Sequence, residues 1–248
     1  MVAGWARHPP VLRQNTVPDV AAFDFDGTLT DGGSVFKFLS AVVGRRAVAT
    51  ASVALSPRLA HAALVSGTVA DRTKEQLFER VLAGADAERV GQVAVRFARE
   101  HLDRHLRSDV RSRFDWHRHR GDRVVIVSAS PELYVREVGG FLGADQVIAT
   151  RLAVDAQGTL TGRYDGANCR GEEKLRRLRE WIDDADGAGG SAGGGVLWAY
   201  GDSRGDLRML GAADVGVNVG RLGRFGKLRS FARLGDTGPG TGAAPSRL

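Results

Sequence analysis

The segment Asp24-Phe25-Asp26-Gly27-Thr28-Leu29-Thr30 directly follows a short apolar run, Val20 to Phe23. On an extended strand, residues two positions apart point to the same side, so Asp24 and Asp26 present two carboxylates together where this strand ends. Gly27 then allows a sharp turn. Two adjacent carboxylates repel each other unless a cation lies between them, and Mg²⁺ prefers such oxygen ligands. The segment therefore predicts a divalent-metal site at a strand end, with a surface turn rich in Asp and Gly as the alternative.

The composition is that of a globular protein. The chain has 248 residues, of which 43% are hydrophobic and 26% are charged, enough for one large domain or a core with a smaller domain. The net charge of +6 and the pI of about 10.1 favour anionic partners such as phosphate esters, nucleic acid or an acidic membrane surface. The single cysteine, Cys169, excludes an internal disulfide and a cysteine-based zinc site. Because neither a secretory signal nor a membrane-spanning run is recognisable, we expect a cytoplasmic protein.

Strand and helix patterns alternate along the chain, which predicts an α/β fold with a Rossmann-like parallel sheet flanked by helices. The core is expected to comprise residues 20–32 and 114–234, including a hairpin around Gly158. Residues 33–113 have helical periodicity and few strand signals, so we expect an inserted all-helical cap domain. Residues 1–19 are predicted to be a flexible leader and residues 235–248 a disordered tail.

Polar residues follow three of the predicted buried strands. The first strand ends at Asp24 and Asp26, the second at Ser128-Ala129-Ser130, and the third at Gly201-Asp202-Ser203-Arg204-Gly205-Asp206. Residues 169–174, Cys-Arg-Gly-Glu-Glu-Lys, begin a predicted helix between the last two. Ligands of open α/β sheets bind at the carboxyl ends of the strands. Acids, a cation, and a hydroxyl before a helix N-terminus are the groups that phosphoryl transfer requires.

These four motifs, in this order, resemble those of the haloacid dehalogenase (HAD) superfamily, in its phosphoserine-phosphatase-like subfamily IB. The resemblance covers about residues 20–219. It implies that Asp24 is a nucleophile that forms an aspartyl phosphate and that Asp26 is the general acid and base. It also implies a Mg²⁺ cofactor held by Asp24, the backbone carbonyl of Asp26, Asp202 and Asp206.

The resemblance further implies a set of residues that hold the phosphorylated substrate. Ser128 and the Ala129 N–H would bind the phosphate, and Thr28 belongs to the first motif. The third motif requires one cation, for which we choose Lys174 as the catalytic residue. Arg170 is the competing candidate and is otherwise assigned to substrate binding. Helical spacing does not separate the two, because residues four positions apart share a helix face.

The implied function is Mg²⁺-dependent hydrolysis of a small phosphomonoester. A membrane-associated lipid-phosphate phosphatase, of the phosphatidylglycerophosphate kind, and a phosphotransferase with the same intermediate are the alternatives. Gly33 and Gly205 stand where phosphoserine phosphatases carry an acid and an asparagine, which argues against phosphoserine itself.

The C-terminal segment around Arg221, Arg224, Lys227 and Arg229 alternates basic and apolar residues. We predict that it lies on the core, with peripheral membrane contact as the alternative. No sequence motif for reading DNA or RNA is present, so we expect no nucleic-acid partner. The oligomeric state is left open.

Overall fold

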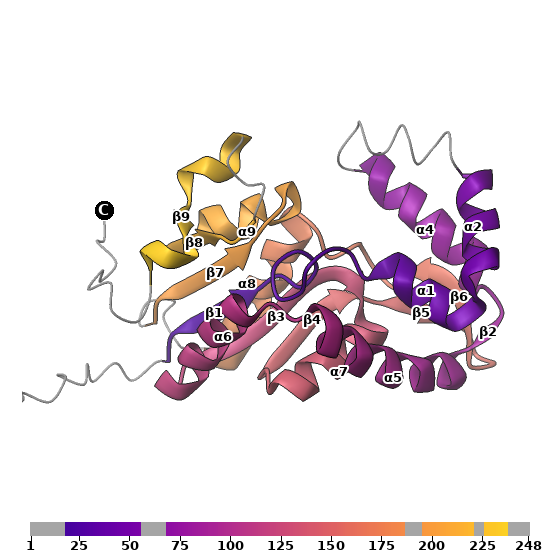
Figure 1. Cartoon of the computed structure of the whole chain (residues 1–248), viewed down its shortest axis with the longest axis horizontal. Coiled ribbons are helices and arrows are strands. Elements are labelled where there is room, and N and C mark those ends of the chain that lie inside the picture. Colours follow the sequence, from indigo (N-terminus) through magenta and orange to yellow (C-terminus); the bar gives the residue numbers. More distant parts are fainter. Residues whose placement is uncertain (1–17, 56–67, 187–194, 221–225, 238–248) are drawn as a thin grey trace, which may run out of the picture.

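The computed structural model describes residues 18–55, 68–186, 195–220 and 226–237. Its core is a six-stranded, all-parallel sheet with the strand order β4-β3-β1-β7-β8-β9 (Figure 1). The strands are β1 (Val20–Phe23), β3 (Arg123–Pro131), β4 (Gln146–Thr150), β7 (Leu197–Gly201), β8 (Val215–Asn218) and β9 (Ala232–Arg233). Because β1 pairs with β3 on one side and β7 on the other, the three strands with polar ends are neighbours.

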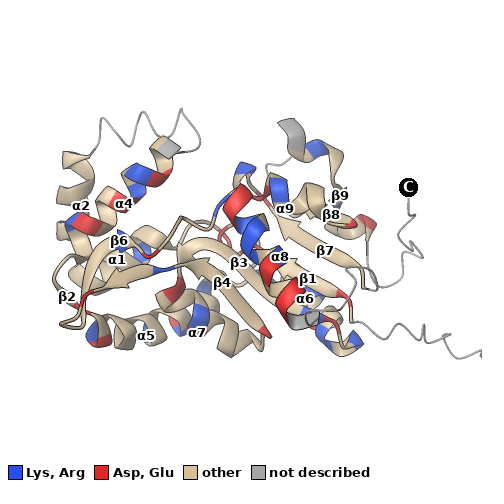
Figure 2. Ribbon diagram, turned by 180° about the vertical axis from the view of Figure 1, so that it is seen from behind, with Lys and Arg blue, Asp and Glu red and all other residues tan. Residues whose placement is uncertain are grey.

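Helices cover both faces of this sheet, as predicted for a Rossmann-like fold. Ala21 and Phe23 of β1 pack in one buried cluster with residues of α6 and α7, whereas Val20 and Ala22 pack in a second cluster with residues of α8 and α9. This alternation explains the continuous apolar run of β1, since both faces of the strand are buried. The helices are α6 (Ser108–Arg120), α7 (Glu132–Leu142), α8 (Glu172–Asp186) and α9 (Leu207–Ala212). Acidic and basic residues are interspersed along α8 (Figure 2).

The inserted segment between β1 and β3 contains mainly helices and lies beyond the carboxyl ends of the core strands (Figure 1). Its elements are α1 (Val35–Val43), α2 (Arg45–Ala54), α4 (Thr68–Leu82), the short strand β2 (Ala85–Asp86) and α5 (Ala87–His105). The helical periodicity of the sequence predicts helices over residues 35–43 and 87–106, and α1 and α5 match these ranges closely.

The prediction of an all-helical cap requires a correction. Strand β2 pairs with β6 (Thr159–Tyr164), which also pairs with β5 (Leu152–Val154), to form a three-stranded antiparallel sheet. The β5–β6 hairpin was expected in the core, but α4 packs on β6 so closely that a Cβ at Gly162 would lie 2.3 Å from Glu79 Cα. The hairpin joins the cap because the chain around β2 supplies backbone donors to it: the N–H of Gly84 donates to the Leu160 carbonyl at 2.9 Å, and the N–H of Ala87 donates to the Gly158 carbonyl at 3.0 Å.

The predicted end of the cap at residue 113 falls inside α6, and this helix packs against the core sheet. Phe114 contacts Phe23, with ring centroids 5.3 Å apart. His117 is fully buried; its Nδ1–H donates to Asp122 at 2.6 Å, and its Nε2 accepts the Tyr200 hydroxyl at 2.8 Å. The cap therefore ends before α6, because the apolar face of that helix covers the sheet.

Residues 235–237, which were predicted to belong to a disordered tail, lie against the core. Arg113 is buried and donates to the carbonyl of Leu234 at 2.9 Å and to the hydroxyl and carbonyl of Thr237. These bonds fix residues 234–237 against α6, so the prediction was wrong for the first residues of the segment.

Several other predictions concern residues outside the described ranges. They concern the leader up to residue 17, the basic residues Arg221 and Arg224, and the tail from residue 238. In the described part of the chain, no helix is both long enough and apolar enough to cross a lipid bilayer.

Candidate active site

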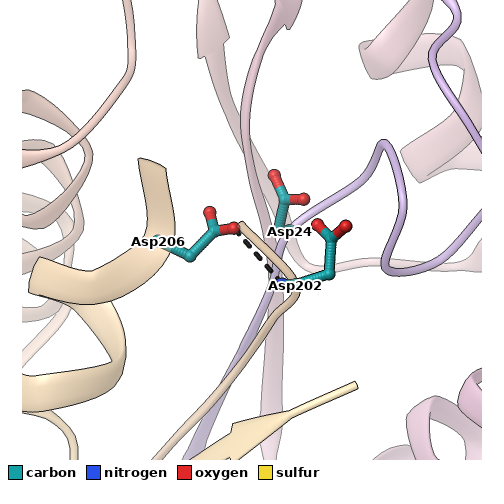
Figure 3. A group of neighbouring side chains, drawn as sticks. All are labelled: Asp24, Asp202 and Asp206. Atoms are coloured by element: carbon teal, nitrogen blue, oxygen red, sulfur yellow. Dashed lines mark hydrogen bonds between the residues drawn. The ribbon is translucent and has the colours of Figure 1, made fainter. Parts of the chain in front are cut away.

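Three aspartates converge at the carboxyl ends of β1 and β7. Asp24 directly follows β1, Asp202 directly follows β7, and Asp206 ends the short 3-10 helix η1 (Arg204–Asp206). One carboxylate oxygen from each lies within 4.8 Å of the others, and their side chains point toward one another (Figure 3). The structure thus brings together the three side chains that were predicted to hold a metal ion.

Lys174 is the cation of this group. Its ammonium donates to Asp24 Oδ1 at 2.7 Å and to Asp206 Oδ1 at 2.6 Å, and the residue is only 1% exposed. Arg170 lies before the first turn of α8 and points elsewhere, with a guanidinium nitrogen 3.9 Å from Asp71 of α4. Of the two cations left open by the sequence, Lys174 is therefore the one that contacts the acids.

The electrostatics of the group favour a bound cation. Burial, together with the charge of Asp206, raises the pKa of Asp24 to about 8. Burial and Asp206 likewise raise the pKa of Asp202 to about 6. A single ammonium faces three carboxylates, so their mutual repulsion is only partly offset. An all-oxygen donor set with excess negative charge fits Mg²⁺.

The turn after Asp26 places Asp202. Gly27 has a φ of 85°, and a Cβ there would lie 2.2 Å from Asp202 Oδ2, so only glycine fits between the turn and this carboxylate. Buried Arg107 donates to the carbonyls of Gly27 at 3.0 Å and Val219 at 2.9 Å, which holds the turn in place. Thr28, predicted to bind substrate, is fully buried and donates to Asp202 at 3.5 Å.

Asp26 points into different surroundings from Asp24. Its Oδ2 accepts the hydroxyls of Ser34 at 2.9 Å and Ser130 at 2.5 Å, and Ser34 also bonds the hydroxyl of Tyr134 at 2.6 Å. Its Oδ1 is buried and has no hydrogen-bond partner within the described ranges. Burial raises the pKa of Asp26. A protonated carboxyl with one free oxygen can donate its proton to a bound ligand.

The second motif, residues 128–130, contacts Asp26 through Ser130 and the neighbouring strand β4 through Ala129. Ser128 and Ser130 are buried, and the Ser130 N–H donates to Ser128 Oγ at 3.0 Å. Strand β3 continues to Pro131, which is the N-cap residue of α7, and the Ser130 hydroxyl donates to Asp26. The carbonyl of Ala129 accepts from Thr150 at 2.8 Å.

Lys74 of α4 is a residue that sequence reasoning missed. Its ammonium donates to the Ala129 carbonyl at 2.6 Å, and burial lowers its pKa to about 8, with Asp26 and Asp71 opposing the shift. Asp71 in turn accepts from the Asn168 side chain at 2.6 Å. In the sequence, Lys74 was one of several charged residues on an amphipathic helix, and nothing local distinguished it. Only the packing of α4 against the core brings it to the site.

A model of haloacid dehalogenase-like hydrolases matches residues 21–211. Protein CicA of Caulobacter vibrioides is 36% identical over 209 residues, which are 84% of this chain and 89% of the relative. A histidinol-phosphatase of Neisseria meningitidis is 27% identical over 129 residues, which cover 52% of this chain and 57% of the relative.

Solved structures share the fold. A protein of unknown function from Bordetella pertussis has a TM-score of 0.72 at 21% identity, covering 88% of this chain and 98% of that one. A phosphoserine phosphatase in its apo form has a TM-score of 0.55 at 19% identity, with coverages of 82% and 86%. The predicted phosphoserine-phosphatase-like architecture is confirmed.

Proposed function

Because this chain belongs to the haloacid dehalogenase-like hydrolases, we propose that it is a Mg²⁺-dependent phosphatase that hydrolyses a small phosphomonoester through an aspartyl phosphate on Asp24. The observation that carries the proposal is the position of Asp24. Its carboxylate is buried, bonded on one oxygen to Lys174, and adjacent to two further acids. The histidinol-phosphatase and phosphoserine phosphatase among its relatives support the reaction type.

The residues present fit a magnesium ion. The carboxylates of Asp24, Asp202 and Asp206 would hold it, together with the backbone carbonyl of Asp26. When bound, Mg²⁺ neutralises charge on the phosphate oxygens and so lowers their repulsion of the attacking carboxylate.

The chemical steps use Asp24 and Asp26 in turn. A carboxylate oxygen of Asp24 attacks phosphorus, the bond from phosphorus to the ester oxygen breaks, and the leaving oxygen takes the proton of Asp26. Asp26 then accepts a proton from water, whose oxygen attacks phosphorus. This second attack releases inorganic phosphate and restores the Asp24 carboxylate.

Four further groups would surround the substrate. The hydroxyl of Ser128 and the N–H of Ala129 would donate to phosphate oxygens, and Lys174 would offset their charge while keeping Asp24 in place. Lys74 comes from the cap and bonds the Ala129 carbonyl, so we expect it to face the leaving alcohol.

A screen of phosphate esters, with Mg²⁺ and with EDTA, tests the proposal. We expect turnover that requires Mg²⁺ and falls by at least about 10³-fold in Asp24→Asn, because the nucleophile is removed. Equal activity of wild type and Asp24→Asn would overturn the assignment. Acid quenching of wild type during turnover should trap phosphate on Asp24, and the absence of labelled protein with a rapidly hydrolysed substrate would count against the intermediate.

A further inference from the structure

The cap contains a pocket of about 560 Å³ between α1 and the C-terminal half of α5. Aromatic rings of Phe36 and Phe97 line it together with three cationic side chains, Lys37, Arg45 and Arg104. None of its lining residues belongs to the candidate active site. A pocket that combines apolar and cationic walls is suited to an anion with an apolar part.

His101 lines this pocket and carries a buried atom without a partner. The residue is 3% exposed, and its Nε2 has no hydrogen-bond partner within the described ranges. Burial lowers the pKa of His101 to about 4, assisted by His105 and Lys37 and opposed by Asp31, so the ring is neutral at pH 7. Burying a polar atom without a hydrogen-bond partner costs stability. A ligand that accepts a hydrogen bond from Nε2 would remove this cost.

The charges around the pocket favour an anion. Lys37 donates to His105 Nε2 at 3.1 Å, so the His105 Nδ1–H donates to Asp31 at 2.7 Å, and this chain of bonds holds Lys37 beside the pocket. Arg45 forms no ion pair with any described residue. Arg104 is paired with the one acid of the lining, Glu100, at 3.4 Å, but both side chains are exposed and the pair is weak.

We propose that this pocket is a second ligand site, which binds an amphiphilic anion with a phosphate or carboxylate head and an apolar group. The head would meet Arg45, Arg104 and the Nε2–H of His101. The apolar group would pack on Phe97 and on Phe36, which is 50% exposed at present. Binding would cover an exposed aromatic ring and satisfy a buried nitrogen at once.

The pocket is distinct from the active site but close to it. Phe97 contacts the ring of fully buried Tyr134 with centroids 5.1 Å apart, and the Tyr134 hydroxyl bonds Ser34, a partner of Asp26. A ligand assay based on activity could therefore confuse the two sites, so the test must report on the pocket itself.

Titration of the full chain with hexylphosphonate in EDTA, followed by NMR of the histidine rings, provides such a test. This probe has no ester bond to hydrolyse. We expect saturable shifts of the His101 and His105 signals, assigned with His101→Gln and His105→Gln, and unchanged signals for His117 and His119. His117 is enclosed by α6 and the sheet, so it reports on changes unrelated to the pocket.

Arginine variants locate the binding. Arg45→Ala and Arg104→Ala should each weaken it about 10-fold, because each removes a charged hydrogen-bond donor. Arg46→Ala and Arg96→Ala are matched controls on the same helices, since both side chains are exposed and outside the lining, and they should bind as wild type. Histidine signals that do not move, or variants of Arg45 and Arg104 that bind as tightly as the controls, would overturn the proposal.

Vesicle binding separates two sources of the anion. Phosphatidylglycerol vesicles that recruit wild type, but not Phe36→Ala, would identify a lipid headgroup as the natural ligand. Phe141→Ala is the control, because Phe141 is similarly exposed and lies on α7. Binding of hexylphosphonate without recruitment to vesicles would identify a free amphiphile instead.

Discussion

Asp24 and Asp26 are two residues apart, yet their surroundings differ in kind. Asp24 is among charges, bonded to Lys174 and close to Asp202 and Asp206, all of them supplied by the core. Asp26 is among hydroxyls, and one of its two donors, Ser34, precedes the first helix of the cap. Burial raises the pKa of Asp24, and in the proposed mechanism a bound Mg²⁺ would offset this so that Asp24 is ionised to attack. Neutral donors and burial suit Asp26 to hold a proton. One short segment thus supplies two carboxyl groups in different surroundings, as the proposed roles of nucleophile and acid require.

The largest expected effect separates these two roles. Asp26→Asn should lower kcat for an alkyl phosphate by about 10²–10⁴-fold, because the leaving oxygen receives no proton. An aryl phosphate with a good leaving group should still phosphorylate Asp24, giving a burst of about one equivalent of phenol before turnover stalls. Rapid-quench kinetics measure the burst. Ser130→Ala keeps the carboxyl and is the control; a variant of Asp26 within 10-fold of wild type on both substrates would contradict the assignment.

Lys174, which is buried, and Lys74, which is half-buried, sharpen the comparison through stability. Lys174→Met should destabilise the protein in EDTA by roughly 3–5 kcal/mol, since it leaves buried carboxylates without their cation. Lys74→Met should cost only about 1 kcal/mol, because Lys74 donates to a carbonyl rather than to a carboxylate. Urea denaturation monitored by circular dichroism measures both. If the two variants lost similar amounts of unfolding free energy, the ion pairs of Lys174 with Asp24 and Asp206 would not be a main source of stability.

A pH dependence of stability tests the surroundings of Asp24 directly. The pKa of Asp24 rises from 3.8 to about 8 on folding, so the folded protein binds this proton more tightly than the unfolded chain. Its contribution to stability is therefore complete below about pH 4 and is lost as the pH rises toward 8. Asp202, with a pKa of about 6, acts in the same direction. In EDTA, the stability of wild type relative to Asp24→Asn should fall between pH 5 and pH 8.

The stability of wild type must be compared with that of Asp24→Asn at each pH. Burial lowers the pKa of His101 and His117, and this makes the stability of both proteins rise with pH below about pH 6.5. Saturating Mg²⁺ should remove the Asp24 effect by favouring the ionised carboxyl. A relative stability that rises with pH in EDTA would show that Lys174 outweighs burial at Asp24.

Much of the site follows from local sequence. Asp24, Asp202 and Asp206 come after buried apolar strands, and parallel strands present their carboxyl ends at one edge, so we expected these acids at one site. The resemblance to the haloacid dehalogenase superfamily assigned them to one metal ion. The choice between Lys174 and Arg170 was not local. Arg170 lies just before α8, and Lys174 lies in its first turn. The packing of α8 on the sheet directs Lys174 toward the acids and leaves Arg170 facing α4.

The cap was harder to predict for a related reason. Its helices have clear apolar periodicity, but the sequence of the β5–β6 hairpin does not indicate which strand it pairs with. Strand β2 has only two residues, Ala85 and Asp86, which is too short to show an alternating pattern. Lys74 and His101 likewise have unremarkable positions on amphipathic helices.

The sequence by itself determined the alternation of strands and helices, the acids at the strand ends and the inserted segment, because apolar periodicity and turn residues act over a few positions. Tertiary structure alone decided which cation meets the acids, which sheet the hairpin joins, and which helix faces form a pocket. Those outcomes depend on contacts between segments far apart in the chain, and no local pattern encodes such contacts.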